Sequence, residues 1–387
     1  MQPRDSAASC PRVAHARLIA SRLLAVAILL APAAGCAQRT ASPPAAPAPD
    51  RLMTARDVQA LPRQAPDHRI AYGKDASQYG ELRVPPGRGP HPVVVLIHGG
   101  CFKAAYDSAA YMGAMGDALK ADGIATWNIE YRRIDQPGGA WPGTYLDVGR
   151  AIDHLRALAV QHALDLGRVV IVGHSAGGHL AMWAAARARL PAASALYIAD
   201  PLPVRGVINL AGPIDMTANI EGYETLCRDT VITTLLGGTA TAVPERYAHA
   251  SANRLLPLGI PQVLVWGEHE EYVPLRLVRA YARAAAGTGD PVRLVVIPGV
   301  GHFEIASPRA SPWPQVHSAI RALLDGRLPP PAPGTAAGAA SVSPDSVATP
   351  TLDERKSITK SIRSRVRSRS FRHGAAAHLK PEFGDEK

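Results

Sequence analysis

Two glycines and one serine near the middle of the chain have the spacing of an activated nucleophile. Gly173, Ser175 and Gly177 fit the pattern G-x-S-x-G, in which the serine sits on a tight strand-to-helix turn that leaves no room for bulk two residues away. The context agrees, because Arg168 to Val172 has the character of a buried strand and Ala176 to Arg189 is rich in helix formers. We therefore expect Ser175 to be a nucleophile rather than part of an ordinary turn.

One histidine is placed to serve Ser175 as a base. A serine hydroxyl is a weak nucleophile unless a base takes its proton and a third group orients that base. His302 follows the predicted strand Val292 to Ile297, so it lies in a loop at the carboxyl edge of a sheet. His174 and His179 flank Ser175, but the first would be held within the turn and the second on the helix. We expect His302 to be the base.

Several carboxylates could orient that base. Glu268, Glu270 and Glu271 follow the predicted strand Gln262 to Trp266, and Asp215 follows the preceding strand. In the hydrolase architecture that uses G-x-S-x-G, the three groups come in the order serine, acid, histidine along the chain. We therefore look for the acid between Ser175 and the histidine.

The loop after residue 266 resembles that of the α/β-hydrolase fold family, whose pattern there is G-x-x-D-x-x-V-P. Gly267, Val273 and Pro274 match it, and Glu270 occupies the acid position. Glutamate is accepted as a triad acid in that family. The resemblance therefore implies Glu270 as the acid, with Asp215 as the alternative, because in some relatives the acid comes from that place.

Backbone donors for a developing oxyanion are expected at two places. The N–H of Ala176 directly follows the serine at the start of a helix. Gly100 and Cys101 belong to a glycine loop whose backbone can approach a substrate closely, and we expect the neighbouring His98 to organise that loop. Val93 to Cys101 resembles the HGG loop of hormone-sensitive-lipase-type esterases and of kynurenine formamidase. Cys101 in place of a third glycine is nearer to the formamidase and feruloyl-esterase-like branch.

Alternating strands and helices surround these motifs, which is typical of a parallel sheet covered by helices. The predicted strands are His68 to Gly73, Gly80 to Val84, Val93 to Ile97, Ile124 to Ile129, Arg168 to Val172, Val204 to Leu210, Gln262 to Trp266 and Val292 to Ile297. The predicted helices are Ala109 to Lys120, Thr144 to His162, Ala176 to Arg189, Leu275 to Ala286 and Trp313 to Leu324. The resemblance covers about residues 68 to 326 and implies the α/β-hydrolase fold.

The predicted fold is a mostly parallel central sheet with helices on both faces and a short cap-like insertion. The insertion is the stretch from Ala211 to Pro261, which is longer than a simple crossover needs. It could form a cap or pocket wall, or it could be an excursion without contact to substrate.

Positive charge is concentrated at the two ends of the chain. The net charge is +10, of which residues 1–50 carry +3 and residues 328–387 carry +4. The residues between these ends carry the remaining +3, which is too little positive charge for a nucleic-acid-binding surface on the folded part. We therefore expect no nucleic-acid partner. The basic run from Arg355 to Arg372 is typical of a solvated tail, with contact to anionic lipid or polyanion as the alternative.

The N-terminal 36 residues have the layout of an export signal. Arg17 and Arg22 precede the apolar run Leu23 to Ala34, which is too short to span a bilayer comfortably. Ala33 to Cys36 resembles a bacterial lipobox, except that the family prefers leucine at the first place. We expect lipidation of Cys36 and a cell-envelope location facing the periplasm, with a plain cleaved signal and secretion as the alternative.

The chain beyond the signal divides into three expected parts. Residues 37–67 are a linker rich in Pro and Ala, residues 68–326 are the catalytic domain, and residues 327–387 are a disordered tail. Two cysteines, Cys101 and Cys227, lie in the catalytic part. An oxidising compartment would permit them to form a disulfide, and two separate buried thiols are the alternative.

Together the motifs imply acyl transfer to water through a covalent acyl-enzyme. We expect a hydrolase of small carboxylic esters. An arylformamidase or a peptidase-type amide hydrolase is the alternative among enzymes, and a non-catalytic envelope lipoprotein that uses the fold as a binding scaffold is the alternative outside them. The sequence has no phosphate-binding loop and no metal-ligand cluster, so we expect no cofactor and no metal.

Overall fold

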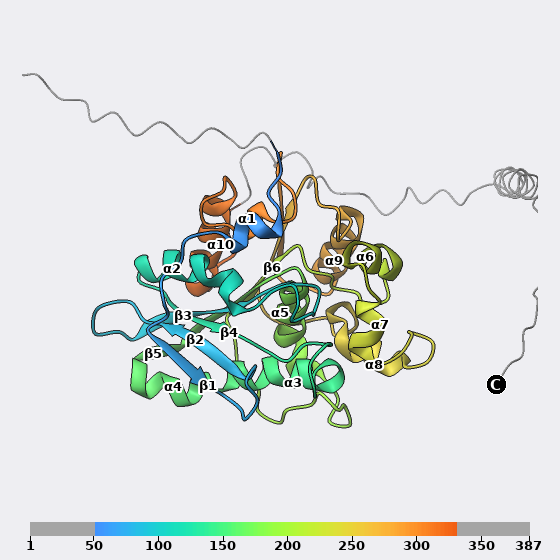
Figure 1. Cartoon of the computed structure of the whole chain (residues 1–387), viewed down its shortest axis with the longest axis horizontal. Helices are drawn as coiled ribbons and strands as arrows, with labels where there is room; N and C mark the ends of the chain where they lie inside the picture. Colours follow the sequence, from blue (N-terminus) through green and yellow to red (C-terminus); the bar gives the residue numbers. More distant parts are fainter. Residues whose placement is uncertain (1–50, 331–387) are drawn as a thin grey trace, which may run out of the picture. The chain divides into compact units, whose positions relative to one another are not determined.

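Eight strands form one sheet in the order β1-β2-β4-β3-β5-β6-β7-β8 (Figure 1). The computed structural model describes residues 51–330. Strand β2 runs antiparallel to β1 and β4, and all the other neighbours are parallel. The strands are β1 His68–Ala71, β2 Tyr79–Arg83, β3 His91–Ile97, β4 Ala125–Ile129, β5 Leu164–His174, β6 Gly206–Leu210, β7 Gln262–Gly267 and β8 Val292–Ile297. The predicted, mostly parallel sheet is confirmed.

Helices cover both faces of this sheet, with α2 and α10 on one side and α3 and α5 on the other (Figure 1). The helices are α1 Ala55–Gln59, α2 Gly113–Ala121, α3 Ala140–Asp153, α4 Leu155–His162, α5 Ala176–Ala186, α6 Ile220–Cys227, α7 Val231–Leu236, α8 Pro244–Ala250, α9 Leu275–Gly287 and α10 Trp313–Leu324. Within residues 51–330, none of them combines the length and the apolar character that a bilayer crossing needs.

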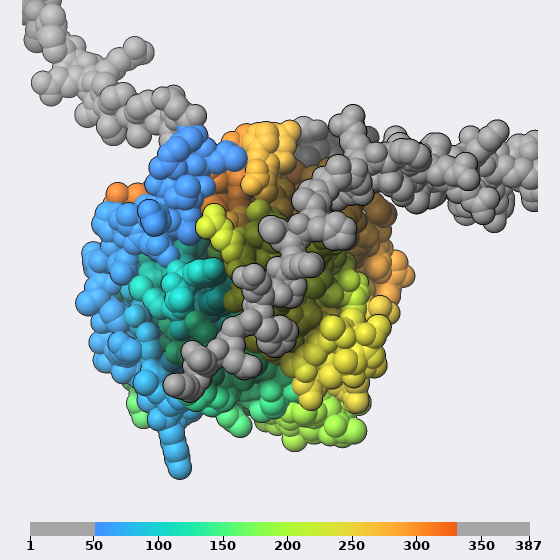
Figure 2. Space-filling model, turned by 45° about the vertical axis from the view of Figure 1, so that its right-hand side comes forward, coloured from blue at the N-terminus to red at the C-terminus, as the bar shows by residue number. Residues whose placement is uncertain are grey.

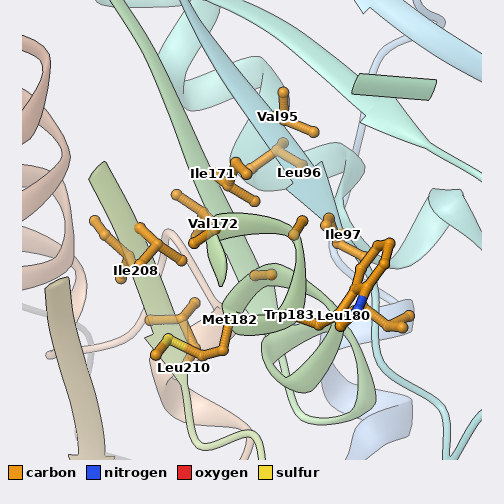
Figure 3. Packing of buried hydrophobic residues seen from close by; sticks show 14 of the residues in the cluster. Val95, Leu96, Ile97, Ile171, Val172, Leu180, Met182, Trp183, Ile208 and Leu210 are labelled. Atoms are coloured by element: carbon orange, nitrogen blue, oxygen red, sulfur yellow. The ribbon is translucent and has the colours of Figure 1, made fainter. Parts of the chain in front are cut away.

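The middle of the sheet is apolar on both faces, as expected of parallel strands that lie between two helical layers. Val95, Ile171 and Ile208 come from the neighbouring strands β3, β5 and β6, and each is fully buried. Met182 and Trp183 of α5 pack into the same cluster (Figure 3). This close packing fixes the carboxyl ends of the central strands, where the candidate site residues begin.

The start of the folded part differs from the prediction. Helix α1 lies inside residues 37–67, which the sequence placed in a linker, and its Val58 is buried. The Asp57 carboxylate accepts the Thr54 N–H at 2.7 Å, as in a capping box. A helix of little more than one turn is too short to show an apolar period, so only the Thr-x-x-Asp spacing could have revealed it.

Two predicted helices also have different bounds. The stretch predicted as one helix over residues 144–162 is divided by a turn at His154 into α3 and α4. Helix α3 spans Ala140–Asp153, but Trp141 is not helical, so its regular part starts at Pro142, a residue that is tolerated in a first turn. The helix after Ser175 ends at Ala186 and continues as a short 3-10 turn, Arg187–Arg189.

The predicted insertion between β6 and β7 folds into the three short helices α6, α7 and α8. In Figure 1 these helices lie together at one side of the sheet, near α9. The export signal, the lipobox cysteine Cys36, residues 37–50 of the predicted linker and the basic tail lie outside the described residues.

Candidate active site

Ser175 lies at the tip of the turn between β5 and α5. Its φ of 54° and ψ of −122° are strained values for a residue with a side chain. The helix after it packs directly on the sheet, since a Cβ on Gly177 would lie 2.1 Å from the carbonyl oxygen of Ile97. A Cβ on Gly173 would lie 2.0 Å from the carbonyl oxygen of Gly177. The glycines of the G-x-S-x-G pattern are therefore required by close packing.

His302 and Glu270 are hydrogen-bonded to each other. The Nδ1 atom of His302 lies 2.7 Å from Oε2 of Glu270, and their side chains are 4% and 1% exposed. The other carboxylate oxygen of Glu270 accepts the backbone N–H groups of Tyr272 and Val273 at 2.7 and 3.0 Å. The Tyr272 ring stacks on the imidazole, with 4.3 Å between centroids. The imidazole of His302 is therefore held at its Nδ1 edge by Glu270 and on one ring face by Tyr272.

Asp215, the alternative acid, does not contact His302. Its carboxylate accepts hydrogen bonds from the N–H and hydroxyl of Thr217 and from the side chain of Asn253. It lines a separate cavity of about 260 Å³ rather than the pocket of Ser175. The structure therefore brings together Ser175, His302 and Glu270 in sequence order and leaves Asp215 apart.

The two histidines that flank Ser175 are occupied elsewhere, as expected. His174 is buried, and its Nε2 lies 2.9 Å from the backbone oxygen of His302; burial holds the pKa of His174 well below its usual value. His179 lies between the hydroxyl of Tyr145 and the backbone oxygen of Pro213. Burial lowers the pKa of His179 to about 4. Both imidazoles make structural contacts in the core rather than partner the serine.

The glycine loop after β3 passes beside the serine. A Cβ on Gly99 would lie 3.0 Å from the Cβ of Ser175. Gly100 and Cys101 adopt positive φ angles of 97° and 51°, and both line the same pocket as Ser175. Ala176 begins α5, where N–H groups have no partner within the helix. Gly100, Cys101 and Ser175 thus line one pocket, and Ala176 directly follows the serine; their role as oxyanion donors stays a prediction.

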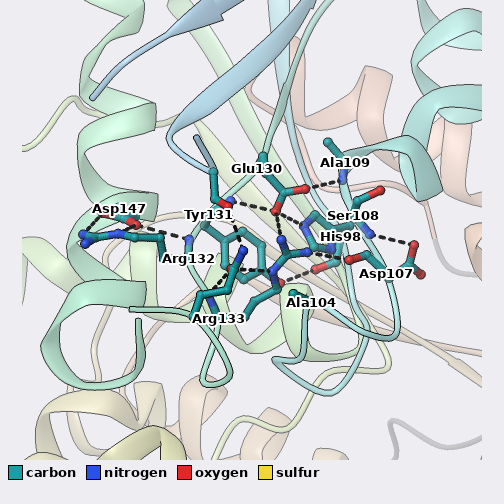
Figure 4. A network of polar contacts seen from close by, with 12 residues as sticks. His98, Ala104, Asp107, Ser108, Ala109, Glu130, Tyr131, Arg132, Arg133 and Asp147 are labelled. Carbon is teal, nitrogen blue, oxygen red and sulfur yellow. Dashed lines mark hydrogen bonds and ion pairs between the residues drawn. The ribbon is translucent and has the colours of Figure 1, made fainter. Parts of the chain in front are cut away.

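A buried network around Glu130 holds this loop (Figure 4). One carboxylate oxygen of Glu130 lies 3.0 Å from Nε2 of His98 and 3.2 Å from the guanidinium of Arg133. Its other oxygen accepts the N–H of Ala109 at 3.0 Å. Burial raises the pKa of Glu130, but His98 and Arg133 outweigh that effect and keep this pKa below its usual value. His98 therefore organises the loop, as predicted, through a carboxylate that the sequence did not reveal.

A disulfide ties the same loop to the insertion. Cys101 and Cys227 are bonded, with their Cα atoms 5.9 Å apart. Cys227 is the last residue of α6. Of the two alternatives left open by the sequence, the structure contains the disulfide.

Ser175 and His302 lie in one pocket of about 530 Å³ whose walls come from distant parts of the chain. Leu226 and Arg228 of the insertion line it, so the insertion is a pocket wall and not an excursion. Helix α1 provides another wall that sequence reasoning missed. In Figure 2 the first described residues, in blue, lie beside the orange segment around residue 300, and the N–H of Met53 donates to the Glu304 carboxylate.

Comparison with known proteins places the chain in a family. The model of the BD-FAE family matches residues 82–283, which is more than half of the 387 residues. The chain belongs to the BD-FAE family. The BD-FAE match includes Ser175 and Glu270 and ends before His302.

Two curated relatives of this BD-FAE member come from Mycobacterium tuberculosis (strain ATCC 25618 / H37Rv). Esterase LipC is 28% identical over 262 residues, which are 66% of this chain and 64% of LipC. Esterase LipQ is 26% identical over 232 residues, which are 57% of this chain and 52% of LipQ. The chain therefore matches less than two thirds of the length of either relative.

Solved structures similar to this BD-FAE member are α/β-hydrolases. An inhibited esterase B from Lactobacillus rhamnosis has a TM-score of 0.59 and 18% identity, over 70% of this chain and 91% of that one. A propionate-bound esterase from Thermogutta terrifontis has a TM-score of 0.53 and 19% identity, over 68% of this chain and 96% of that one. At these identities the likeness concerns the fold, and the predicted α/β-hydrolase fold is confirmed.

Proposed function

We propose that this chain is a serine hydrolase that cleaves small carboxylic esters through an acyl-enzyme. One observation carries the proposal: Ser175, on a strained turn, shares a pocket with His302, whose imidazole is hydrogen-bonded to the buried Glu270 at 2.7 Å. That combination is what an uncharged hydroxyl needs to become a nucleophile. The names of the two curated relatives, both esterases, support an ester as the substrate.

The proposed reaction has two halves. In the first, the Ser175 hydroxyl adds to the ester carbonyl while His302 takes its proton, and the same proton then goes to the departing alcohol. The N–H groups of Ala176 and of Gly100 or Cys101 stabilise the negative oxygen of the tetrahedral intermediate. In the second half, water adds to the acyl-enzyme with His302 again as base, and the carboxylic acid leaves.

Glu270 has a supporting role in this scheme. Its carboxylate fixes the orientation and tautomer of His302 and stabilises the imidazolium that forms when the proton is taken. The two backbone N–H groups that it accepts hold the carboxylate in place. No step requires a metal or a cofactor.

Labelling with a fluorophosphonate probe tests the nucleophile. The wild-type protein should be labelled and should hydrolyse p-nitrophenyl acetate, whereas Ser175→Ala should lose both properties and keep its fold. His302→Ala should also lose turnover. If wild type and Ser175→Ala react alike with the probe, the chain is not a serine hydrolase and the non-catalytic scaffold becomes the better description.

A substrate panel separates esters from amides. We expect p-nitrophenyl, acetyl and feruloyl esters to be cleaved faster than formylkynurenine and peptide amides. A kcat/KM for formylkynurenine above that of every ester would reassign the chain as an arylformamidase. Efficient cleavage of a peptide amide would reassign it as a peptidase.

We also propose that the protein is exported and anchored through Cys36. The Cys101–Cys227 disulfide supports export, since disulfides persist in oxidising compartments. Mass spectrometry of the mature N-terminus tests the anchor. An acylated Cys36 supports it, and an unmodified N-terminus near Ala37 would replace it with a plain secretory signal.

A further inference from the structure

One face of α6 is directed at the candidate active site. Tyr223, Leu226 and Cys227 have the spacing i, i+3, i+4, which places them on the same side of the helix. Leu226 lines the pocket of Ser175, and Cys227 is bonded to Cys101 in the glycine loop. Tyr223 lies one turn before them, and it is 3% exposed.

The Tyr223 hydroxyl is a buried donor with the Ser175 hydroxyl nearby. Within residues 51–330 it makes no hydrogen bond, although buried tyrosine hydroxyls are usually paired. Burial raises the pKa of Tyr223 far above its usual value, and the nearby Ser175 hydroxyl opposes that rise. The phenol therefore stays protonated near neutral pH, close to the proposed nucleophile.

Tyr223 also lines the second cavity, which shares Tyr272 with the pocket of Ser175. It lines the apolar cavity of about 260 Å³ together with Tyr272 and Val273. Tyr272 lines the Ser175 pocket as well and stacks on His302. The phenol of Tyr223 thus lies in a cavity that adjoins the Ser175 pocket at Tyr272, with the Ser175 hydroxyl nearby.

We propose that the Tyr223 hydroxyl donates a hydrogen bond to an oxygen of the ester bound at Ser175, as a side-chain donor in addition to the backbone N–H groups. This inference rests on the proposed ester hydrolysis. A donor that gains its partner only when the ester reacts stabilises the transition state more than the free enzyme, and such differential stabilisation raises kcat. Sequence reasoning missed Tyr223, because a single tyrosine on an insertion helix carries no motif.

The variant Tyr223→Phe tests the proposal, because it keeps the ring and removes only the hydroxyl. The expected result is a fall in kcat of roughly 10- to 1,000-fold, between the loss of an ordinary neutral hydrogen bond and the loss of a well-placed oxyanion donor. Since the hydroxyl has no protein partner, the melting temperature should stay within about 1 °C of wild type.

Tyr145→Phe is the matched control. The hydroxyl of Tyr145 is also buried, but it lies 2.8 Å from Nε2 of His179, and Tyr145 does not line the Ser175 pocket. Its removal should lower the melting temperature by several degrees, roughly as the loss of one buried hydrogen bond predicts. Its kcat should stay within about twofold of wild type, opposite to the behaviour of the Tyr223 variant.

Esters with good and poor leaving groups identify the oxygen. A larger loss with ethyl acetate than with p-nitrophenyl acetate assigns the Tyr223 hydrogen bond to the departing oxygen. An equal loss with both esters assigns it to the carbonyl oxygen, and either result supports the proposal.

Two results would overturn it. The first is that Tyr223→Phe keeps the wild-type kcat on both esters, although the wild-type protein is active and is labelled at Ser175. The proposed function then stands, but Tyr223 is not one of its donors. The other is a fall in kcat that parallels a fall in melting temperature, which marks a purely structural tyrosine. A wild type that neither cleaves esters nor reacts with fluorophosphonate removes the proposed function itself, and this inference with it.

Discussion

Cys101 and Cys227 are bonded to each other across 126 residues of sequence. Cys101 belongs to the glycine loop beside Ser175, and Cys227 ends the helix that carries Tyr223. The disulfide therefore joins the loop proposed to bind the oxyanion to the insertion that forms another part of the pocket wall. Rigid support of this kind keeps donors in place before the substrate arrives.

Removing the disulfide should affect both stability and rate. A cross-link that closes so long a loop restricts the unfolded chain, and the loop-entropy relation assigns about 3–5 kcal/mol to it. The double variant Cys101→Ser with Cys227→Ser should unfold at lower urea concentration and have a lower kcat. Dithiothreitol should change wild type in the same direction and leave the double variant unaffected. Equal urea midpoints for the two proteins would contradict this prediction.

Glu270 and Asp215 can be compared with matched amide variants. Glu270→Gln keeps the size of the side chain but removes the charge opposite His302, and loss of a triad carboxylate lowers kcat by up to about 10⁴-fold. Asp215→Asn should change kcat by less than about threefold, since its carboxylate contacts Thr217 and Asn253 instead. Steady-state kinetics on p-nitrophenyl acetate measures both. A larger loss in the Asp215 variant would reassign the acid.

Asp107 should make stability depend on pH. Burial raises the pKa of Asp107 to about 6. A folded-state pKa above the unfolded value favours folding below about pH 4, and this contribution is lost as the pH rises through about 6. The free energy of unfolding can be measured with urea for both proteins at about pH 4.5 and at about pH 7.5. The difference between Asp107→Asn and wild type should shift by roughly 2 kcal/mol in favour of the variant on going from the lower to the higher pH. A difference between the two proteins that is the same at both pH values would exclude a raised pKa.

The backbone of Gly100 should be intolerant of a side chain. Its φ is +97°, and a Cβ there would lie 2.7 Å from the Cβ of Asp107. Gly100→Ala should shift the loop beside Ser175 and lower kcat by more than about tenfold. Gly123→Ala is the control, because Gly123 has φ +80° with nothing within 4 Å. Gly123→Ala should be less stable because of backbone strain alone, and it should keep the wild-type kcat. Equal losses of kcat in the two variants would show that the effect of Gly100→Ala does not come from the loop beside Ser175.

The sequence was sufficient where local chemistry dictates structure. The apolar run that leads to Ser175 predicted a central strand, because parallel strands covered on both faces must be apolar throughout. The run that leads to His302 predicted β8, the half-buried strand at the edge of the sheet. The glycines around Ser175 predicted the turn. Any side chain at Gly177 would place its Cβ 2.1 Å from the carbonyl oxygen of Ile97, so only glycine fits there. These two features located the nucleophile and the histidine at one edge of the sheet.

The remaining features depend on contacts between distant segments. Glu130 holds the glycine loop through His98, 32 residues away in sequence, and no local pattern marks a carboxylate for such a role. The proposed role of Tyr223 depends on how α6 packs in the fold, which no local sequence pattern shows. The pairing of Cys101 with Cys227 was likewise open, since spacing does not determine which thiols meet.

The hydrogen bond from Met53 to Glu304 has a practical consequence for anyone who shortens the gene. Glu304 also accepts the N–H of Gly301 at 3.0 Å, next to His302. A polypeptide trimmed to begin at residue 68 would lose both this anchor and the wall formed by α1, and one trimmed to residues 82–283 would lack the histidine altogether. Minimal versions intended for assay should therefore retain residues 51–330.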